Sequence, residues 1–172
     1  YLETDEGPIP LEIFGAHNLN NLAGAKWICQ QMGINEMDFY EAIGSFSGAS
    51  KRLEKIAAHQ STIVYKDFAH APSKVLATTT AVKAQHPNKR LLACLELHTY
   101  SSLNESFLVT YKNSLQTADQ AVVFFSPKAL KIKKMKVLQP EQISMAFDHP
   151  NLKVFTDSLS FQEFLKAQDY SH

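Results

Sequence analysis

Short apolar runs alternate along the chain with segments whose apolar residues have helical spacing. Together the two patterns predict strands that alternate with helices. Short apolar runs predict strands over residues 9–14, 53–59, 61–68, 90–97, 121–125 and 152–155. Helical spacing predicts helices over residues 18–32, 36–43, 72–85, 105–115 and 140–147. A last helix is predicted with a capping-box pattern, residues 160–163, inside its start. Strands separated by helix-length segments indicate an α/β fold with a mostly parallel sheet and helices on both faces.

A small, polar segment with the sequence GSFSGAS, residues 44–50, interrupts this pattern. Glycine and serine in such a run are typical of a hinge between domains. We therefore expect residues 1–49 to be the mainly helical end of one domain and residues 50–172 to form a second, α/β domain. The chain begins without Met and stops just after a predicted helix, so we expect a piece of a longer protein with a truncated second domain.

The charge balance limits the partners that the chain can attract. Lys and Arg number 17 and so do Asp and Glu, so no net field draws it to nucleic acid or to an anionic membrane. A local run of five lysines between residues 128 and 136 lacks interleaved aromatic residues, and we expect a solvated edge there. No apolar run approaches the ~18 residues of a membrane span and no leader pattern opens the chain, so we expect a cytoplasmic protein.

The two cysteines give no sign of a disulfide or a metal site. Cys29 and Cys94 lie in apolar runs, and neither has the spacing to other cysteines or histidines that metal ligands show. We expect both to be buried thiols in a reducing compartment, and we expect no metal site within this chain.

Side chains that can carry chemistry stand where predicted strands end, which is where parallel sheets bind ligands. Asp67 follows one strand, with His70 three residues later and Pro72 opening the next helix. A carboxylate there can bind a ribose hydroxyl or a metal-bound water, and an imidazole can contact a phosphate or a substrate carboxylate. Helix capping by Asp67 is the alternative. His98 ends another strand with Glu96 on the same face, a candidate substrate pair for which a strand-end cap is the alternative.

Two further candidate groups adjoin glycine-containing segments. Asn18 and Asn21 stand three residues apart near the start of the first long helix, so both amides share a face that can match the edge of an adenine. Lys51 and Arg52 follow the hinge and offer positive charge to a phosphoryl group or an anionic substrate. A helix cap at Asn18 and solvated charges at Lys51 and Arg52 are the alternatives.

Taken in order, three motifs resemble those of the Mur ligases of bacterial peptidoglycan synthesis. They are G-x-H-N-x-x-N at residues 15–21, F-x-G-x-x-x-R at residues 46–52 and D-F-A-H-A-P at residues 67–72. The resemblance covers nearly the whole chain, from the end of the central ATP-binding domain through most of the Rossmann-like C-terminal domain. It implies an ATP-dependent amide ligase, in which the carboxylate of UDP-N-acetylmuramate becomes an acyl phosphate that an incoming amine attacks.

The resemblance also implies roles for individual residues. Asn21 matches the asparagine that contacts adenine, Asn18 the other asparagine of that motif, Arg52 the arginine near the phosphates and Asp67 a carboxylate on the ribose side. His70 matches the first histidine of a D-x-x-H-H-P motif that belongs to members acting on UDP-N-acetylmuramate itself.

Two departures from the family motifs concern the incoming amine. Ala71 replaces the second histidine, and residues 96–102, ELHTYSS, lack the arginines of the alanine-adding members. We therefore expect a peptide as the amine, as in cell-wall recycling, and L-alanine is the alternative.

A phosphate-binding loop of the form G-x-x-G-K-[ST] does not occur in the sequence. In the family this loop and the Mg²⁺ ligands lie upstream, so the resemblance implies that ATP and Mg²⁺ are held mainly by another part of the protein. We expect the chain alone to be inactive. A free-standing, non-catalytic binding module of Rossmann-like fold is the alternative.

Overall fold

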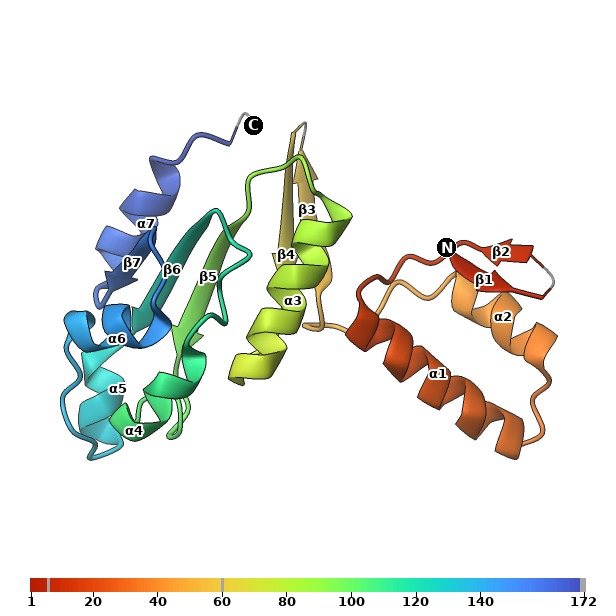
Figure 1. Cartoon of the computed structure of the whole chain (residues 1–172), viewed down its shortest axis with the longest axis horizontal. Helices are drawn as coiled ribbons and strands as arrows, with labels where there is room; N and C mark the ends of the chain where they lie inside the picture. The colour runs from red at the N-terminus through yellow and green to blue at the C-terminus, as the bar shows by residue number, and fades with distance from the viewer. Residues whose placement is uncertain (6, 60, 171–172) are drawn as a thin grey trace. The chain divides into compact units, whose positions relative to one another are not determined.

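The computed structural model describes residues 1–5, 7–59 and 61–170. It forms two compact units, one of residues 1–57 and 64–68 and the other of residues 58–63 and 69–172. The elements of both are labelled in Figure 1.

The first unit opens with an antiparallel hairpin of β1 (Leu2–Thr4) and β2 (Gly7–Ile9). The strand that we predicted over residues 9–14 is wrong beyond Ile9. Pro10 is the physical reason, because it has no N–H to donate to a strand ladder. An irregular segment follows instead and leads into the first helix.

Two helices form most of the rest of this unit, α1 (Ala16–Gln31) and α2 (Glu36–Gly44), both close to their predicted bounds. Lys26 of α1 forms an ion pair with Glu36 of α2 and donates a 2.7 Å hydrogen bond to the hydroxyl of Tyr40. The Asn35 side chain accepts a 2.9 Å hydrogen bond from the backbone N–H of Asp38, so it caps α2.

Strands β3 (Glu54–His59) and β4 (Thr62–Lys66) pair in a two-stranded sheet, as predicted. Helix α3 (Pro72–Gln85) has the predicted bounds, with Pro72 in its first turn. A parallel sheet follows, in the order β5 (Leu92–Leu97), β6 (Gln120–Phe125), β7 (Leu152–Phe155) (Figure 1). The predicted α/β fold with a parallel sheet is thus confirmed.

The larger hydrophobic core lies on one face of this sheet. Register pairs such as Leu95 with Val123 and Leu97 with Phe125 place their side chains on that face, where all four are buried. The other face of β6 and β7 is covered by α7 (Ser158–Lys166), which stacks Phe161 on Phe124 with ring centroids 5.7 Å apart.

The connections after β5 and β6 differ from the prediction. The helix expected over residues 105–115 is shorter than predicted. Helix α4 (Glu105–Leu108) passes into a 3₁₀ turn, η1 (Val109–Tyr111). Asn113 then has a φ of 63°, a left-handed conformation that is incompatible with a continuing helix. A further helix that we did not predict, α5 (Pro127–Ile132), follows β6, and α6 (Pro140–Phe147) has the predicted bounds.

The last helix, α7, begins two residues before the capping-box pattern at residues 160–163, so the pattern lies inside the start of the helix, as predicted. Asp157 is the cap, because its Oδ2 accepts a 2.8 Å hydrogen bond from the backbone N–H of Ser160. Ser160 therefore lies inside the helix and is a partner of the cap.

No helix of the described residues is long and apolar enough to cross a membrane. The expectation of two buried thiols is wrong: Cys29 is half-buried and Cys94 is exposed. Cys94 lies on the face of β5 opposite the core and opens to solvent on one side. Neighbouring atoms still desolvate it enough to raise the pKa of its thiol to about 11.

Candidate functional site

Asn18 is fixed at the start of α1 by the chain just before the helix. Gly15 precedes the helix with a φ of 90°, a conformation that favours glycine, and its carbonyl accepts from the backbone N–H of Asn18 at 3.0 Å. The Asn18 amide donates a 2.9 Å hydrogen bond to the carbonyl of Phe14. Asn18 thus has a structural partner, whereas Asn21, one turn later, is exposed.

Asp67 belongs to the same unit as Asn18. The ring of Tyr65 meets the ring of Phe14 edge to face, with centroids 5.5 Å apart. Phe14 therefore contacts both Asn18 in the first turn of α1 and Tyr65 of β4, the strand that ends just before Asp67. The Asp67 carboxylate accepts a 2.8 Å hydrogen bond from the backbone N–H of Phe68. It does not cap α3, whose N-cap is Ala71.

Arg52 lies in a turn with an unusual backbone. Its N–H donates to the carbonyl of Ala49 at 3.1 Å, while its neighbours Lys51 and Leu53 have φ values of 58° and 51°. Both are left-handed backbone conformations that residues other than glycine seldom adopt. The backbone N–H of Lys51 donates to the Glu54 carboxylate at 2.8 Å, and the Arg52 side chain is exposed. The turn therefore presents a guanidinium to solvent on a constrained backbone.

The three candidates on the substrate side lie in the second unit, at or near the carboxyl end of β5. The rings of His70 and His98 have centroids 6.2 Å apart, so the structure brings these two residues together. Nδ1 of His98 lies 3.3 Å from the carbonyl oxygen of Glu96, whose side chain is exposed. The hydroxyl of Tyr111 donates to the carbonyl of His70 and holds that loop against the core.

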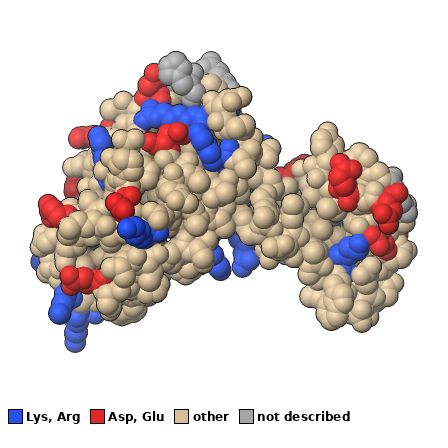
Figure 2. Space-filling model, viewed as in Figure 1, with Lys and Arg blue, Asp and Glu red and all other residues tan. Residues whose placement is uncertain are grey.

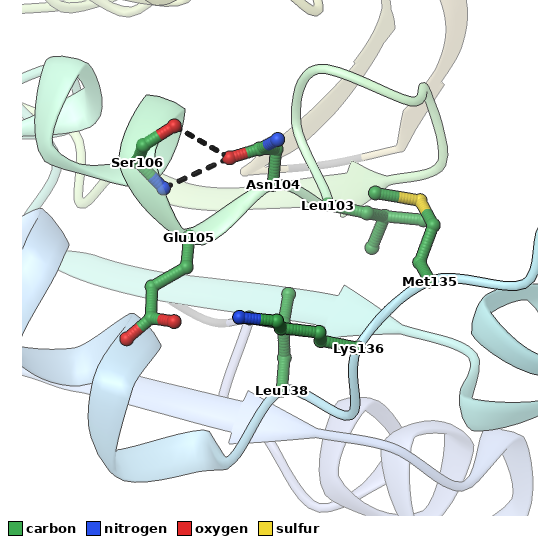
Figure 3. A pocket seen from close by; sticks show the side chains of 7 residues that line it. All are labelled: Leu103, Asn104, Glu105, Ser106, Met135, Lys136 and Leu138. Atoms are coloured by element: carbon green, nitrogen blue, oxygen red, sulfur yellow. Dashed lines mark hydrogen bonds between the residues drawn. The ribbon is translucent and has the colours of Figure 1, made fainter.

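A cavity of about 540 Å³ opens in the same unit, and sequence reasoning missed it. Figure 3 shows its lining side chains, which come from the start of α4 and from the segment after α5. They are Leu103, Asn104, Glu105, Ser106, Met135, Lys136 and Leu138. Their positions in the sequence could have indicated the cavity, because these residues follow the carboxyl ends of two neighbouring parallel strands, where ligands commonly bind.

Polar groups of the cavity are fixed by their neighbours. The Asn104 carbonyl oxygen accepts from the backbone N–H of Ser106 at 2.9 Å and from its hydroxyl at 2.7 Å (Figure 3). The Glu105 carboxylate accepts a 2.7 Å hydrogen bond from the amide of Gln142 on α6. A neutral partner on α6 therefore holds Glu105 in position.

The described residues offer no cluster suited to a metal ion, and the sequence offers no loop suited to a triphosphate. Among the described residues no three His, Cys, Asp or Glu side chains come together as metal ligands. The sequence also contains no phosphate-binding loop. The candidate groups of the first unit are amides, a carboxylate and a guanidinium. These groups suit the base, the ribose and an outer phosphate of a nucleotide, respectively.

The fold and these side chains define an α/β protein with polar groups gathered at strand ends, a common arrangement in ligand-binding proteins. A scan against models of known protein families found no match. Individual proteins do match. The chain is 35% identical over 115 residues to UDP-N-acetylmuramate–L-alanine ligase of Caldicellulosiruptor bescii, an alignment that covers 67% of this chain and 25% of that protein.

Solved structures show the same fold at low identity. A murein peptide ligase from Psychrobacter arcticus has a TM-score of 0.60 at 21% identity, covering 90% of this chain and 32% of that one. Mycobacterium tuberculosis folylpolyglutamate synthase, complexed with ADP and AMPPCP, has a TM-score of 0.61 at 15% identity, covering 94% of this chain and 35% of that one.

The chain is a homologue of the Mur ligases, as its motifs predicted. It spans about a quarter of the length of the Caldicellulosiruptor relative.

Proposed function

We propose that this chain is the C-terminal part of an ATP-dependent ligase that joins a peptide to the carboxylate of UDP-N-acetylmuramate. The observation that carries the proposal is the 35% identity to a UDP-N-acetylmuramate–L-alanine ligase. In this proposal residues 1–49 end the ATP-binding domain and residues 50–172 form the C-terminal domain.

The first unit would contribute the nucleotide side of the site. Asn18 and Asn21 would contact the adenine, with Asn18 oriented by its bond to the Phe14 carbonyl. Asp67 would accept from the ribose hydroxyls, and Lys51 and Arg52 would lie near the phosphates. ATP supplies the phosphoryl group that activates the carboxylate. No step is assigned to Mg²⁺, because no described cluster of this chain fits it.

The second unit would receive the amine. His70 and His98 lie close enough to contact one substrate together, and Glu96 is at the same strand end. An imidazole can act as a general base and accept a proton from a substrate ammonium, which leaves an amine able to attack. One of this histidine pair would therefore act as the general base for the amine.

L-alanine is the second candidate for the amine, because the relative at 35% identity is named for that substrate. The departures at Ala71 and over residues 96–102 favour the peptide. A non-catalytic binding module is the third possibility, and it would give no product with either amine.

The test uses the complete gene product that contains this chain. It is incubated with ATP, Mg²⁺, UDP-N-acetylmuramate and either L-alanine or L-alanyl-γ-D-glutamyl-meso-diaminopimelate, and ADP and the amide are measured. We expect ADP and amide in equal amounts, with higher kcat/KM for the tripeptide. ATP turnover without amide, or no turnover at all, would overturn the proposal.

A further inference from the structure

We propose that Lys133 and Lys136, in the segment after β6, bind carboxylates of the amine substrate. The inference rests on the proposed function and names its substrate class, a short peptide with more than one carboxylate. A single amino acid would engage at most one of the two lysines.

The first observation is an uncompensated run of charge. Residues 126–139 contain five of the chain's 17 Lys and Arg and no Asp or Glu. Among the described residues, none of these five forms an ion pair with an acidic side chain. Figure 2 shows blue side chains at the end of the molecule where α5 lies in Figure 1. The five are Lys128, Lys131, Lys133, Lys134 and Lys136.

The second observation is where two of these cations lie. Leu97 of β5 pairs with Phe125 of β6 in parallel register, so the two strands end side by side. The segments that follow them therefore meet. The ammonium of Lys133 lies 3.9 Å from the ring centroid of Tyr100, two residues after His98, and Lys136 lines the cavity.

The third observation is the chemistry of the cavity. Its volume of about 540 Å³ is in the range of small-ligand sites. Leu103, Met135 and Leu138 can pack against methylene groups. Figure 3 shows the Lys136 side chain extending towards the side of the cavity that Glu105 occupies. One cation and one anion lining the same cavity suit the carboxylate and the ammonium of one amino-acid group.

Together these observations distinguish two of the five lysines from two others in the same segment. Lys133 contacts Tyr100 in the loop that carries His98, and Lys136 lines the cavity. Lys128 and Lys131 lie on α5 with exposed side chains, and neither lines the cavity. The second pair therefore provides a matched control of equal charge in the same segment.

The test measures steady-state kinetics of the complete gene product with the tripeptide L-alanyl-γ-D-glutamyl-meso-diaminopimelate. We expect Lys133→Gln and Lys136→Gln each to raise the KM for the tripeptide about tenfold, the effect of losing a charge-assisted hydrogen bond. The KM values for ATP and UDP-N-acetylmuramate should change less than about twofold. The Lys128→Gln/Lys131→Gln double variant should match the wild type, and added salt should raise the KM of the wild type more than that of Lys136→Gln.

An active enzyme whose tripeptide KM is unchanged in both variants would overturn this inference and leave the proposed function standing. An equal rise in the Lys128→Gln/Lys131→Gln control, or a rise in the KM for UDP-N-acetylmuramate in place of the tripeptide, would also overturn it. A wild-type protein that forms no amide with any amine would overturn the proposed function and this inference with it.

Discussion

At the scale of single residues, the turn around Arg52 is the most unusual feature of the first unit. Lys51 and Leu53 both have left-handed backbone conformations, and each costs on the order of 1 kcal/mol for a residue with a side chain. Leu53 is also buried, which helps to hold the turn in place. Strained backbone of this kind is often found where a side chain must be presented to a ligand.

Replacement of the two candidate charges should reduce catalysis. We expect Arg52→Ala and Asp67→Ala, in the complete protein, each to lower kcat by about 10²-fold, the scale of losing a preorganised charged contact. Steady-state ADP release measures the effect. Lys55→Ala, at an exposed position nearby, is the control and should retain wild-type activity. Near-normal kcat in both variants would remove Arg52 and Asp67 from the site.

The residue types of the candidate site were predictable from the sequence, but their surroundings were not. The sequence places Asp67 after a strand. Only the structure shows that the N-cap of α3 is Ala71 and not Asp67, and that Phe14 contacts Tyr65 in the strand before Asp67. Likewise, the sequence cannot show that His70 and His98 come within 6.2 Å, because 27 intervening residues separate them. Contacts between distant residues depend on strand pairing, which apolar spacing alone does not determine.

At the scale of elements, the start of α1 depends on one glycine. Gly15→Ala should destabilise the protein by about 1 kcal/mol, since alanine resists a φ of 90°, and should raise the KM for ATP by displacing Asn18. Gly24→Ala is the matched control in the middle of α1. No atom lies within 4 Å of its new Cβ, so it should stabilise the protein by about 0.5–1 kcal/mol. Urea denaturation checks both values. Equal effects from the two variants would contradict this account of Gly15.

One carboxylate joins α3 to the sheet. Asp119 Oδ2 accepts from the backbone N–H of Leu91 at 2.7 Å and from Lys83 at 2.8 Å. The Leu91 N–H, and after it the Lys83 ammonium, lower the pKa of Asp119 below its usual value of 3.8. A lowered pKa adds stability above that usual value, and the contribution is lost as the pH falls through the lowered pKa.

Asp119→Asn keeps an acceptor for Leu91 and removes the charge. We expect it to lower the free energy of unfolding by about 1 kcal/mol at pH 7, a value reduced by the partial exposure of the pair. The difference from the wild type should shrink as the pH falls below about 4. Asp148→Asn is the control, because its ion pair with Lys112 is exposed and should contribute about 0.3 kcal/mol or less. Urea denaturation at several pH values measures both, and a pH-independent loss would contradict the assignment.

Element ends were predictable where a single residue determines them locally. Pro72 starts α3, Pro140 starts α6 and Asn35 caps α2, each at the expected place. Errors arose where a short segment depends on its surroundings. The six residues of α5 carry too little periodicity to predict a helix, although Ser126 caps it and Leu130 is buried.

At the scale of the whole molecule, the proposed function assigns this chain only part of a nucleotide-binding site. It contains no phosphate-binding loop, and in this account the triphosphate is held elsewhere in the protein. Calorimetric titration of the 172-residue chain with ATP should therefore show binding no tighter than about 1 mM, while the complete protein binds ATP more tightly. Micromolar binding by the chain alone would contradict this division of the site.

The central claim is that the complete protein uses ATP to activate the carboxylate of UDP-N-acetylmuramate for amide formation. Oxygen transfer tests this claim most directly, since such activation moves a carboxylate oxygen to phosphate. The complete protein is supplied with substrate labelled with ¹⁸O in that carboxylate, together with ATP and the tripeptide. In the proposed reaction the carboxylate oxygen attacks the γ-phosphorus, the amine then displaces phosphate from the acyl carbon, and the bridging oxygen leaves with phosphate. We predict one ¹⁸O atom in each phosphate released. Label in AMP, or amide formation with unlabelled phosphate, would contradict the account.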